Sequence, residues 1–265
     1  MTTDNRQRLI IRVSRTSLAF STTNGTDVIY ERYPLKSSIS ISANMREALR
    51  SGPMLQENYR HVVVMVDSPV LMTPTDLYRK EEEDSLYHYT FTGQEQYAVT
   101  HAVVPDLNAV AVFSIHKDLR MVLRDHYGDT VNFQPLMISV WRHLYQKSFT
   151  GPRQKLYGHF HDRQLEVFAF TQNRFKFYNS YAVGNEPNNA LYYLLSVWKQ
   201  LGMNPREDEL HVSGEIPEKE LLKEETQKYV KRVFFGNPSG EFNRAQVTQI
   251  EGMPYDLMMY YLKGR

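Results

Sequence analysis

Two histidines and an aspartate stand close together between positions 159 and 162. His159 and His161 are two residues apart in a segment that predicts a β-strand, so their side chains should point to the same side. With Asp162 they could supply two or three ligands to a divalent ion. The alternative is an ordinary polar strand face or loop end. No third histidine is linked to them by spacing, although His211 could approach from a neighbouring strand.

A separate carboxylate, Asp67, directly follows the apolar run His61–Val66, which is typical of a strand buried on both faces. The end of such a strand is a position that can carry catalysis in α/β folds. A loop or capping aspartate ahead of Pro69 is the simpler alternative. Asp67 is therefore a candidate binding residue and not an assigned catalytic one.

Several catalytic classes lack their motifs in this sequence. The chain contains no cysteine, which excludes disulfides, thiolate metal sites and cysteine nucleophiles. There is no Gly-x-Ser-x-Gly elbow of the kind that serine hydrolases use. There is also no Walker-type loop and no Gly-x-Gly-x-x-Gly. The sequence therefore supports neither a serine hydrolase nor a P-loop nucleotide enzyme.

The composition is that of a globular protein with little net charge. The chain has 265 residues, of which 42% are hydrophobic and 23% charged, and this argues against disorder. A net charge of +1 gives no bias toward polyanions, so nucleic acid is not an expected partner, and a solvated linker explains the basic stretch from Arg142 to Lys155. The apolar runs are too short for membrane insertion and no signal peptide is recognised, so we expect a cytoplasmic protein.

The order of predicted elements occurs twice along the chain. In the first half, three short strands joined by tight turns such as Asn24-Gly25 precede a helix and then the strand His61–Val66. In the second half, three strands between Lys155 and Tyr181 precede a helix that begins near Pro187, and Glu209–Val212 follows as a strand. Each half thus predicts the order β-β-β-α-β.

An offset of 147 residues brings the two halves into register. It places Leu9 on Leu156 and Leu18 on Leu165, and it matches apolar positions across the three strands. Two unrelated meanders could match in this way, so the shared order of elements is the stronger evidence. We therefore expect a structural duplication.

The remaining segments are assigned from their periodicity. Alternation of Tyr87, Tyr89 and Phe91 predicts a strand, and apolar positions from Leu221 to Val233 predict one amphipathic helix. A final helix is expected over Pro254–Leu262, and its apolar side is the favoured contact surface, either with the chain's own first half or with a second copy. Small and chain-breaking residues from 148 to 152 predict a domain boundary. The expected division is a first half at 1–150, with an inserted strand-rich region, and a second half at 151–265.

Two β-β-β-α-β halves in one chain resemble the actin/Hsp70/sugar-kinase superfamily of duplicated ribonuclease-H-like domains. The second half, with its strands from Lys155 to Tyr181 and the segment Glu209–Gly214, looks similar to the actin-like proteins of pilus assembly and secretion. The whole chain also resembles an uncharacterised bacterial family with that fold. The resemblance implies an α/β fold in which each half has a mixed sheet.

ATPases of this superfamily carry Asp-x-Gly at the end of the first strand of each half, for magnesium and phosphate. The matching stretches here are Arg12-Val13-Ser14 and His159-Phe160-His161, and neither has the aspartate or the glycine. An arginine in place of a carboxylate should repel the ion, because each unit charge pair contributes about 4 kcal/mol at ~4 Å and an effective dielectric constant near 20. The adenosine-side turn, which usually has paired glycines, keeps one in Val212-Ser213-Gly214.

These departures favour a non-catalytic protein-interaction or scaffold module with no cofactor, acting on an unidentified protein partner or on a second copy of itself. The class-level alternative is a nucleotide-dependent switch or kinase-like enzyme that closes its two halves on Mg-ATP. A metal-dependent enzyme using the paired histidines is a third interpretation. The candidate ligand-binding residues are Arg12, Ser14, Arg15, Thr16, Asp67, His159, His161, Asp162, Ser213 and Gly214.

Overall fold

The computed structural model describes residues 8–172 and 174–263, which fall into two units. Unit 1 holds the described residues up to Val104 together with Val110–Ile138 and Ile250–Gly252. Unit 2 holds Pro105–Ala109, Ser139–Gln249 and the described residues from Met253 onward. The expected boundary between residues 150 and 151 stays a prediction. In the described ranges, no helix combines the length and the apolar character that crossing a bilayer needs.

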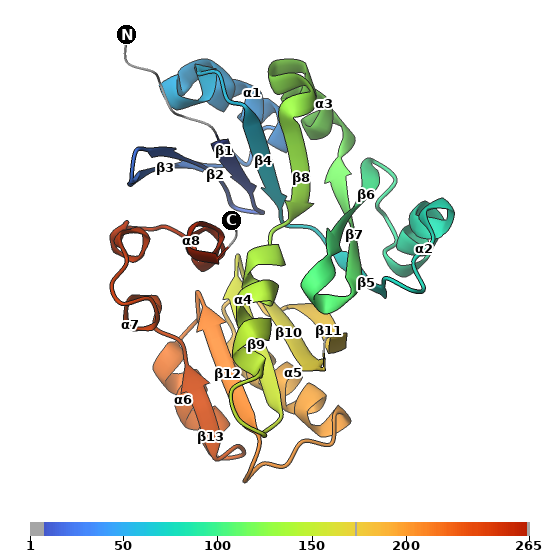
Figure 1. The fold of residues 1–265 in the computed structure, drawn as a ribbon, viewed down its shortest axis with the longest axis vertical. Helices are drawn as coiled ribbons and strands as arrows, with labels where there is room; N and C mark the ends of the chain where they lie inside the picture. Colours follow the sequence, from blue (N-terminus) through green and yellow to red (C-terminus); the bar gives the residue numbers. More distant parts are fainter. Residues whose placement is uncertain (1–7, 173, 264–265) are drawn as a thin grey trace. The chain divides into compact units, whose positions relative to one another are not determined.

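Unit 1 is built on a five-stranded mixed sheet in the order β3-β2-β1-β4-β8 (Figure 1). The first three strands form an antiparallel meander, β4 runs parallel to β1, and β8 runs parallel to β4. The strands are β1 Arg8–Val13, β2 Ser17–Asn24, β3 Asp27–Pro34, β4 His61–Val66 and β8 Val131–Pro135. The predicted meander, its Asn24-Gly25 turn and the buried apolar strand are confirmed.

Unit 2 repeats this sheet in the order β11-β10-β9-β12-β13, with the same strand directions. Its strands are β9 Lys155–His161, β10 Gln164–Thr171, β11 Arg174–Ala182, β12 Glu209–Gly214 and β13 Arg232–Phe235. Val13 pairs with Leu18 in unit 1, and Phe160 pairs with Leu165 in unit 2, as the 147-residue offset requires. The predicted duplication of a ribonuclease-H-like α/β half is confirmed.

Helices are placed on the sheets by their apolar stripes. In unit 1, α1 Ile41–Ser51 packs against α3 Lys117–Tyr127. In unit 2, α5 Pro187–Gln200 begins with the predicted proline and lies beside α6 Lys219–Gln227. The helix α5 approaches β9 so closely that a Cβ at Gly158 would lie 2.9 Å from Leu194 Cδ2.

The two faces of the unit 2 sheet differ in chemistry, because strand residues alternate between them. The face under α5 is apolar, and its core includes Leu156, Phe160, Leu165, Val167, Leu194 and Leu210. The opposite face carries aromatic and polar side chains and is covered by α4 Ile138–Ser148. Trp141 of α4 meets Phe175 with ring centroids 5.8 Å apart, and Tyr145 meets Phe170 at 5.3 Å. This aromatic and polar face holds the candidate residues His159, His161 and Ser213.

A second, three-stranded sheet of unit 1 has the order β5-β7-β6. Its elements are β5 Val70–Pro74, α2 Glu83–Thr90, β6 Tyr97–Val104 and β7 Ala109–His116. The strand predicted from Tyr87, Tyr89 and Phe91 is wrong, because these residues lie in or directly after α2. The rings of Tyr87 and Phe91 are four residues apart in sequence and 4.9 Å apart in space, which is helical spacing.

The long helix predicted from Leu221 to Val233 is also wrong. The helix α6 ends at Gln227, and Val233 belongs to β13, which pairs in parallel with β12 and extends the sheet. A short apolar run is compatible with a helix or with a strand. Here the residues around Val233 form a strand because they pair with the edge of β12. The remaining elements are α7 Pro238–Glu241, α8 Tyr255–Lys263 and the 3-10 helices Pro53–Gln56, Lys80–Glu82, Pro105–Leu107, Gly128–Thr130 and Gln246–Gln249.

The final helix is present as α8, close to its predicted bounds. Its apolar residues Leu257 and Met259 are fully buried, and Met258 is only 8% exposed. These side chains are therefore buried within the folded chain and are not available for contact with a second copy, one of the two partners that the sequence left open.

Candidate functional site

In unit 1 the end of β1 and the turn that follows it hold four of the predicted site residues. Arg12 is buried near the end of β1, whereas Arg15 and Thr16 are exposed. Ser14 Oγ donates to the Ser17 carbonyl at 3.1 Å and accepts the Ser17 N–H at 3.2 Å and the Thr16 N–H at 3.4 Å. The Ser14 hydroxyl thus closes the turn internally, at the position where the resemblance implies a glycine.

Asp67 follows β4 and continues its pairing, since its N–H donates to the Val13 carbonyl at 2.9 Å. Arg15 Nε donates to Asp67 Oδ2 at 3.3 Å, and the Asp67 side chain is 5% exposed. The structure therefore brings together two residues that the sequence identifies separately, and it does so as an ion pair. A divalent cation would compete with the Arg15 guanidinium for this carboxylate.

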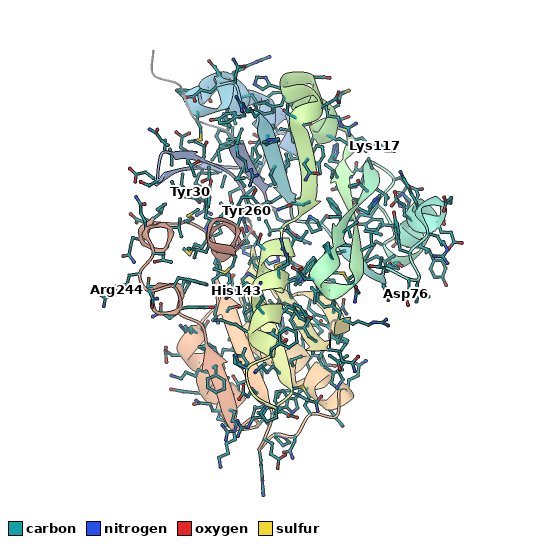
Figure 2. The ribbon with its side chains drawn as sticks, in the orientation of Figure 1. Tyr30, Asp76, Lys117, His143, Arg244 and Tyr260 are labelled. Atoms are coloured by element: carbon teal, nitrogen blue, oxygen red, sulfur yellow. The ribbon has the colours of Figure 1, made fainter. Side chains whose placement is uncertain are left out.

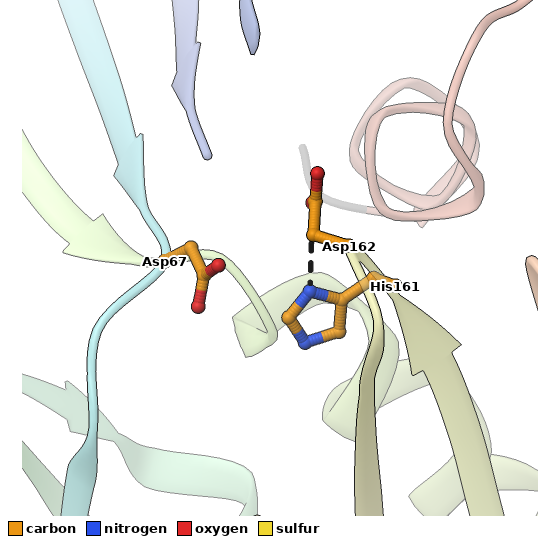
Figure 3. A group of neighbouring side chains, drawn as sticks. All are labelled: Asp67, His161 and Asp162. Atoms are coloured by element: carbon orange, nitrogen blue, oxygen red, sulfur yellow. Dashed lines mark ion pairs between the residues drawn. The ribbon is translucent and has the colours of Figure 1, made fainter. Parts of the chain in front are cut away.

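In unit 2, His159 and His161 lie on the same face of β9, as predicted, with ring centroids 6.0 Å apart. His159 is fully buried, and its Nδ1 lies 2.9 Å from Ser213 Oγ on β12. His161 Nε2 lies 3.2 Å from Glu166 Oε1 on β10. Its other nitrogen, Nδ1, lies 3.7 Å from Asp162 Oδ2 (Figure 3). The sequence did not identify Glu166 as a partner.

These contacts give each histidine of the unit 2 sheet its own partner. The two nitrogens of His161 face different carboxylates, so a single ion could use only one of them. His211 does not join the pair: its ring stacks on Phe234 at 4.9 Å, and its Nε2 lies 2.9 Å from Glu209. The approach of His211 that the sequence left open therefore adds no third ligand within unit 2.

Gly214 ends β12 with φ at +89°, in a region that favours glycine. It is paired with Phe160 of β9, and an added Cβ would overlap the Phe160 carbonyl oxygen and lie 2.9 Å from its carbon and nitrogen. The glycine that the resemblance assigns to an adenosine-side turn is thus required by the close approach of two strands.

A pocket of about 460 Å³ opens in unit 2 at the carboxyl ends of the parallel strands β12 and β13. Such ends are where α/β sheets bind ligands, and the volume suits a small molecule. Ser213 is the predicted site residue that lines it, beside the rings of Tyr157, His211 and Phe234. Burial lowers the pKa of His211 even though Glu209 acts to raise it, so a neutral imidazole faces this space at pH 7.

Glu241, at the end of α7, contacts three other side chains beside the pocket through its carboxylate. His143 of α4 (Figure 2) places its Nε2 2.7 Å from Glu241 Oε1, and Lys147 forms an ion pair with the same oxygen. The Tyr255 hydroxyl donates to the two carboxylate oxygens at 3.4 and 3.3 Å. We call these four residues the Glu241 cluster, and they connect α4, α7 and α8.

The Glu241 cluster holds an ionised carboxylate in a partly buried place. Burial acts to raise the pKa of Glu241, but the hydrogen bonds from His143 and Lys147 outweigh it and leave that pKa below its ordinary value. Burial, reinforced by Glu241, raises the pKa of Tyr255 far above its ordinary value, so the phenol remains a donor. The cluster is therefore suited to joining helices and not to proton transfer near pH 7.

The Glu241 cluster was not predicted from the sequence. His143 and Lys147 are four residues apart, which puts them on one side of a helix, but they were interpreted as part of a basic linker. Glu241 gave no signal, because the segment around it contains glycine, asparagine and proline and has no clear period. The contact between His143 and Glu241 spans 98 residues of sequence and follows only from the tertiary fold.

Replacing Tyr157 with phenylalanine should raise the stability of unit 2 by up to about 1 kcal/mol. The Tyr157 hydroxyl is buried and has no hydrogen-bond partner among the described residues, so its removal relieves an unsatisfied donor. Both tryptophans, Trp141 and Trp198, lie in unit 2, so urea unfolding followed by their fluorescence measures this unit. Tyr255→Phe, which removes a bonded hydroxyl, should lower stability by about as much. A loss in both variants would contradict the expectation.

Comparisons with known proteins agree with this fold. A family model described as "Protein of unknown function (DUF3822)" matches residues 1–233. A solved structure from Bacteroides thetaiotaomicron VPI-5482, described as a protein with actin-like ATPase fold and unknown function, is 26% identical, with a TM-score of 0.82 over 89% of this chain and 93% of that one. A chain of the PilM-PilN type IV pilus biogenesis complex is 9% identical, with a TM-score of 0.55 over 88% and 89%. No curated protein matches. The predicted actin-like fold is confirmed.

Proposed function

Because the chain belongs to the DUF3822 family and has the actin-like ATPase fold, we propose that it is a non-catalytic protein-interaction module built on that fold. The observation that carries the proposal is the internal bonding at the two stretches that match Asp-x-Gly. In unit 1 the Ser14 hydroxyl closes its own turn, and in unit 2 His159 is bonded to Ser213. Ser14 in the first stretch and His159 in the second thus each have a hydrogen-bond partner within their own unit.

The residues at these stretches also fit magnesium and triphosphate poorly. Magnesium prefers carboxylate and water oxygens, whereas the unit 1 stretch offers Arg12, and the nearby Asp67 is paired with Arg15. The positive charge of Arg15, whose side chain is 49% exposed, is the feature that favours the second candidate, a nucleotide-dependent switch. Participation of this fold in a protein assembly has a precedent in the PilM-PilN complex, whose likeness extends to the fold alone.

Mg-ATP is expected to leave the thermal unfolding of the full chain unchanged. A ligand present at 100 times its Kd would stabilise the folded chain by about 2.7 kcal/mol, a shift of several degrees that differential scanning fluorimetry detects. ATP without magnesium and magnesium without ATP are the controls. The rate of phosphate release from Mg-ATP is expected to be the same with the protein as in buffer alone.

Two variants make this test decisive. If Mg-ATP raises the melting temperature and Arg12→Ala or the surface variant Arg15→Ala abolishes the rise, the chain binds nucleotide and the non-catalytic proposal is wrong. Arg32→Ala, on the edge strand β3 of the same unit, is the control for non-specific loss of charge and should keep any such rise.

A further inference from the structure

The two outer strands β3 and β11 occupy equivalent places in the duplicated sheets. Each is the terminal strand of its sheet order, and among the described strands β10 is the one that pairs with β11. A terminal strand leaves a row of backbone N–H and C=O groups that a further strand can bind. Proteins usually protect such edges with charged residues or proline. The duplication therefore lets the two edges be compared position by position.

From the middle of the outer strand onward, the edge of unit 1 carries these protective residues and the edge of unit 2 does not. Phe20 pairs with Glu31 in unit 1, and its equivalent Val167 pairs with Asn179 in unit 2. From this position onward, β3 has the sequence Glu31-Arg32-Tyr33-Pro34, whereas β11 has Asn179-Ser180-Tyr181-Ala182. The two charges and the proline of one edge are thus replaced by neutral residues on the other.

The strand β11 also has the composition of a strand that pairs. It is nine residues long, contains four aromatic residues, and has neither an acidic residue nor a proline. A register shift near its turn leaves Phe177–Ala182 regular, and Asn179 and Ala182 are exposed. Neutral segments of about six residues with high β propensity are typical of intermolecular sheets. Tyr181 of β11 stacks on Tyr193 of α5 with ring centroids 4.2 Å apart, and the neighbouring Tyr192 is 66% exposed.

Other edges of the described sheets are less suited to pairing. The strands β8 and β13 have five and four residues, and β5 and β8 end in proline. The strand β6 is longer, but α2 packs against it and it lies close to β8. The β11 edge is therefore the long and exposed one, and it is neutral over Phe177–Ala182.

We propose that β11 pairs antiparallel with β11 of a second copy of this chain, which joins two five-stranded sheets into one. Asn179 would lie opposite itself on the two-fold axis, with Phe177 opposite Tyr181 in both halves and Lys176 opposite Ala182. Both cations of the strand, Arg174 and Lys176, precede its middle, so antiparallel pairing keeps them apart whereas parallel pairing would set them side by side. In such a two-fold dimer the β11 edges of both copies are paired, so no further copy can add at this strand.

One hydrogen bond would change partner when the sheets join. Asn179 Oδ1 accepts the Ser180 N–H at 2.9 Å. In the pair, this N–H donates to the Tyr178 carbonyl of the second copy, and the carboxamide turns to solvent. The inference rests on the strand edge alone, so it holds whether or not the chain binds a nucleotide.

A single cysteine at the axis tests the pairing directly, because the chain has none of its own. Residues opposite each other in a non-hydrogen-bonded antiparallel pair have Cα atoms about 4.5 Å apart, within the range of a disulfide. On mild oxidation, Asn179→Cys should form a covalent dimer of the full chain. Glu31→Cys, at the equivalent place on β3, should remain monomeric on a non-reducing gel. Equal cross-linking of the two variants would overturn the proposal.

Transplanting the protected edge tests it without oxidation. The triple variant Asn179→Glu, Ser180→Arg and Ala182→Pro gives β11 the residues of β3, and it should sediment as a monomer while the wild-type chain sediments as a dimer. The control variant Glu31→Arg, Arg32→Glu should stay dimeric. A wild-type chain that is monomeric at every concentration, or a triple variant that remains dimeric, would overturn the proposal. If the triple variant fails to fold, the cysteine cross-link decides.

Discussion

Alanine at position 214 is expected to destabilise unit 2 by about 4 kcal/mol or more. The backbone of Gly214 has φ at +89°, and a residue with a Cβ is strained there by about 1–3 kcal/mol. The added Cβ would also overlap the Phe160 carbonyl oxygen, so β12 would have to move away from β9. That movement would disturb the bond from the Glu215 N–H to the same oxygen, now 2.9 Å long, and overpacking costs about 1–3 kcal/mol more.

The measurement is urea unfolding followed by tryptophan fluorescence, which reports on unit 2. Gly202→Ala is the matched control, because Gly202 has φ at +64° and no atom lies within 4 Å of its added Cβ. This control should lose only about 1–2 kcal/mol, the cost of a left-handed conformation. Equal losses in the two variants would show that the overlap with Phe160 is not the cause.

Most of the strands could be predicted because their signals lie in short stretches of neighbouring residues. The run His61–Val66, the Asn24-Gly25 turn and Pro187 at a helix start each depend on a few neighbouring residues. The offset of 147 residues could be found because two copies of the same order support each other. The strand prediction for the α2 segment was wrong, because three alternating aromatic residues are also compatible with a helix in which Tyr87 and Phe91 lie on one side.

The sequence predicts where the candidate residues lie in their strands, but it does not predict which residues they contact. The period of a strand places His159 and His161 on one face, and the order of elements places Asp67 at the end of β4. Neither rule identifies what a side chain contacts across the fold. Arg15 and Asp67 are 52 residues apart, and His159 and Ser213 are 54 apart, so their bonds follow from strand pairing that only the structure supplies.

Glu241→Gln is expected to cost unit 2 about 2–3 kcal/mol at pH 7. Removing one member of a buried charge pair costs about 3–5 kcal/mol, and the Lys147 side chain, at 42% exposed, is screened by water and reduces the effect. His143 is 5% exposed on its side chain and would keep only a neutral amide as partner. Because the cluster joins α4, α7 and α8, the loss should appear in urea unfolding followed by the two tryptophans.

The same variant has a defined pH signature. The pKa of Glu241 is lower in the folded chain than its ordinary value of 4.5, so its stabilisation is fully present above pH 4.5 and is lost as the pH falls through the folded pKa. The stability gap between wild type and Glu241→Gln should therefore be constant near neutral pH and shrink in acid. Glu225→Gln, which breaks a solvent-exposed pair with Lys228, should leave the stability nearly unchanged, because water screens the two charges. A gap that does not change between neutral pH and pH 3 would mean that the carboxylate charge is not what holds the three helices together.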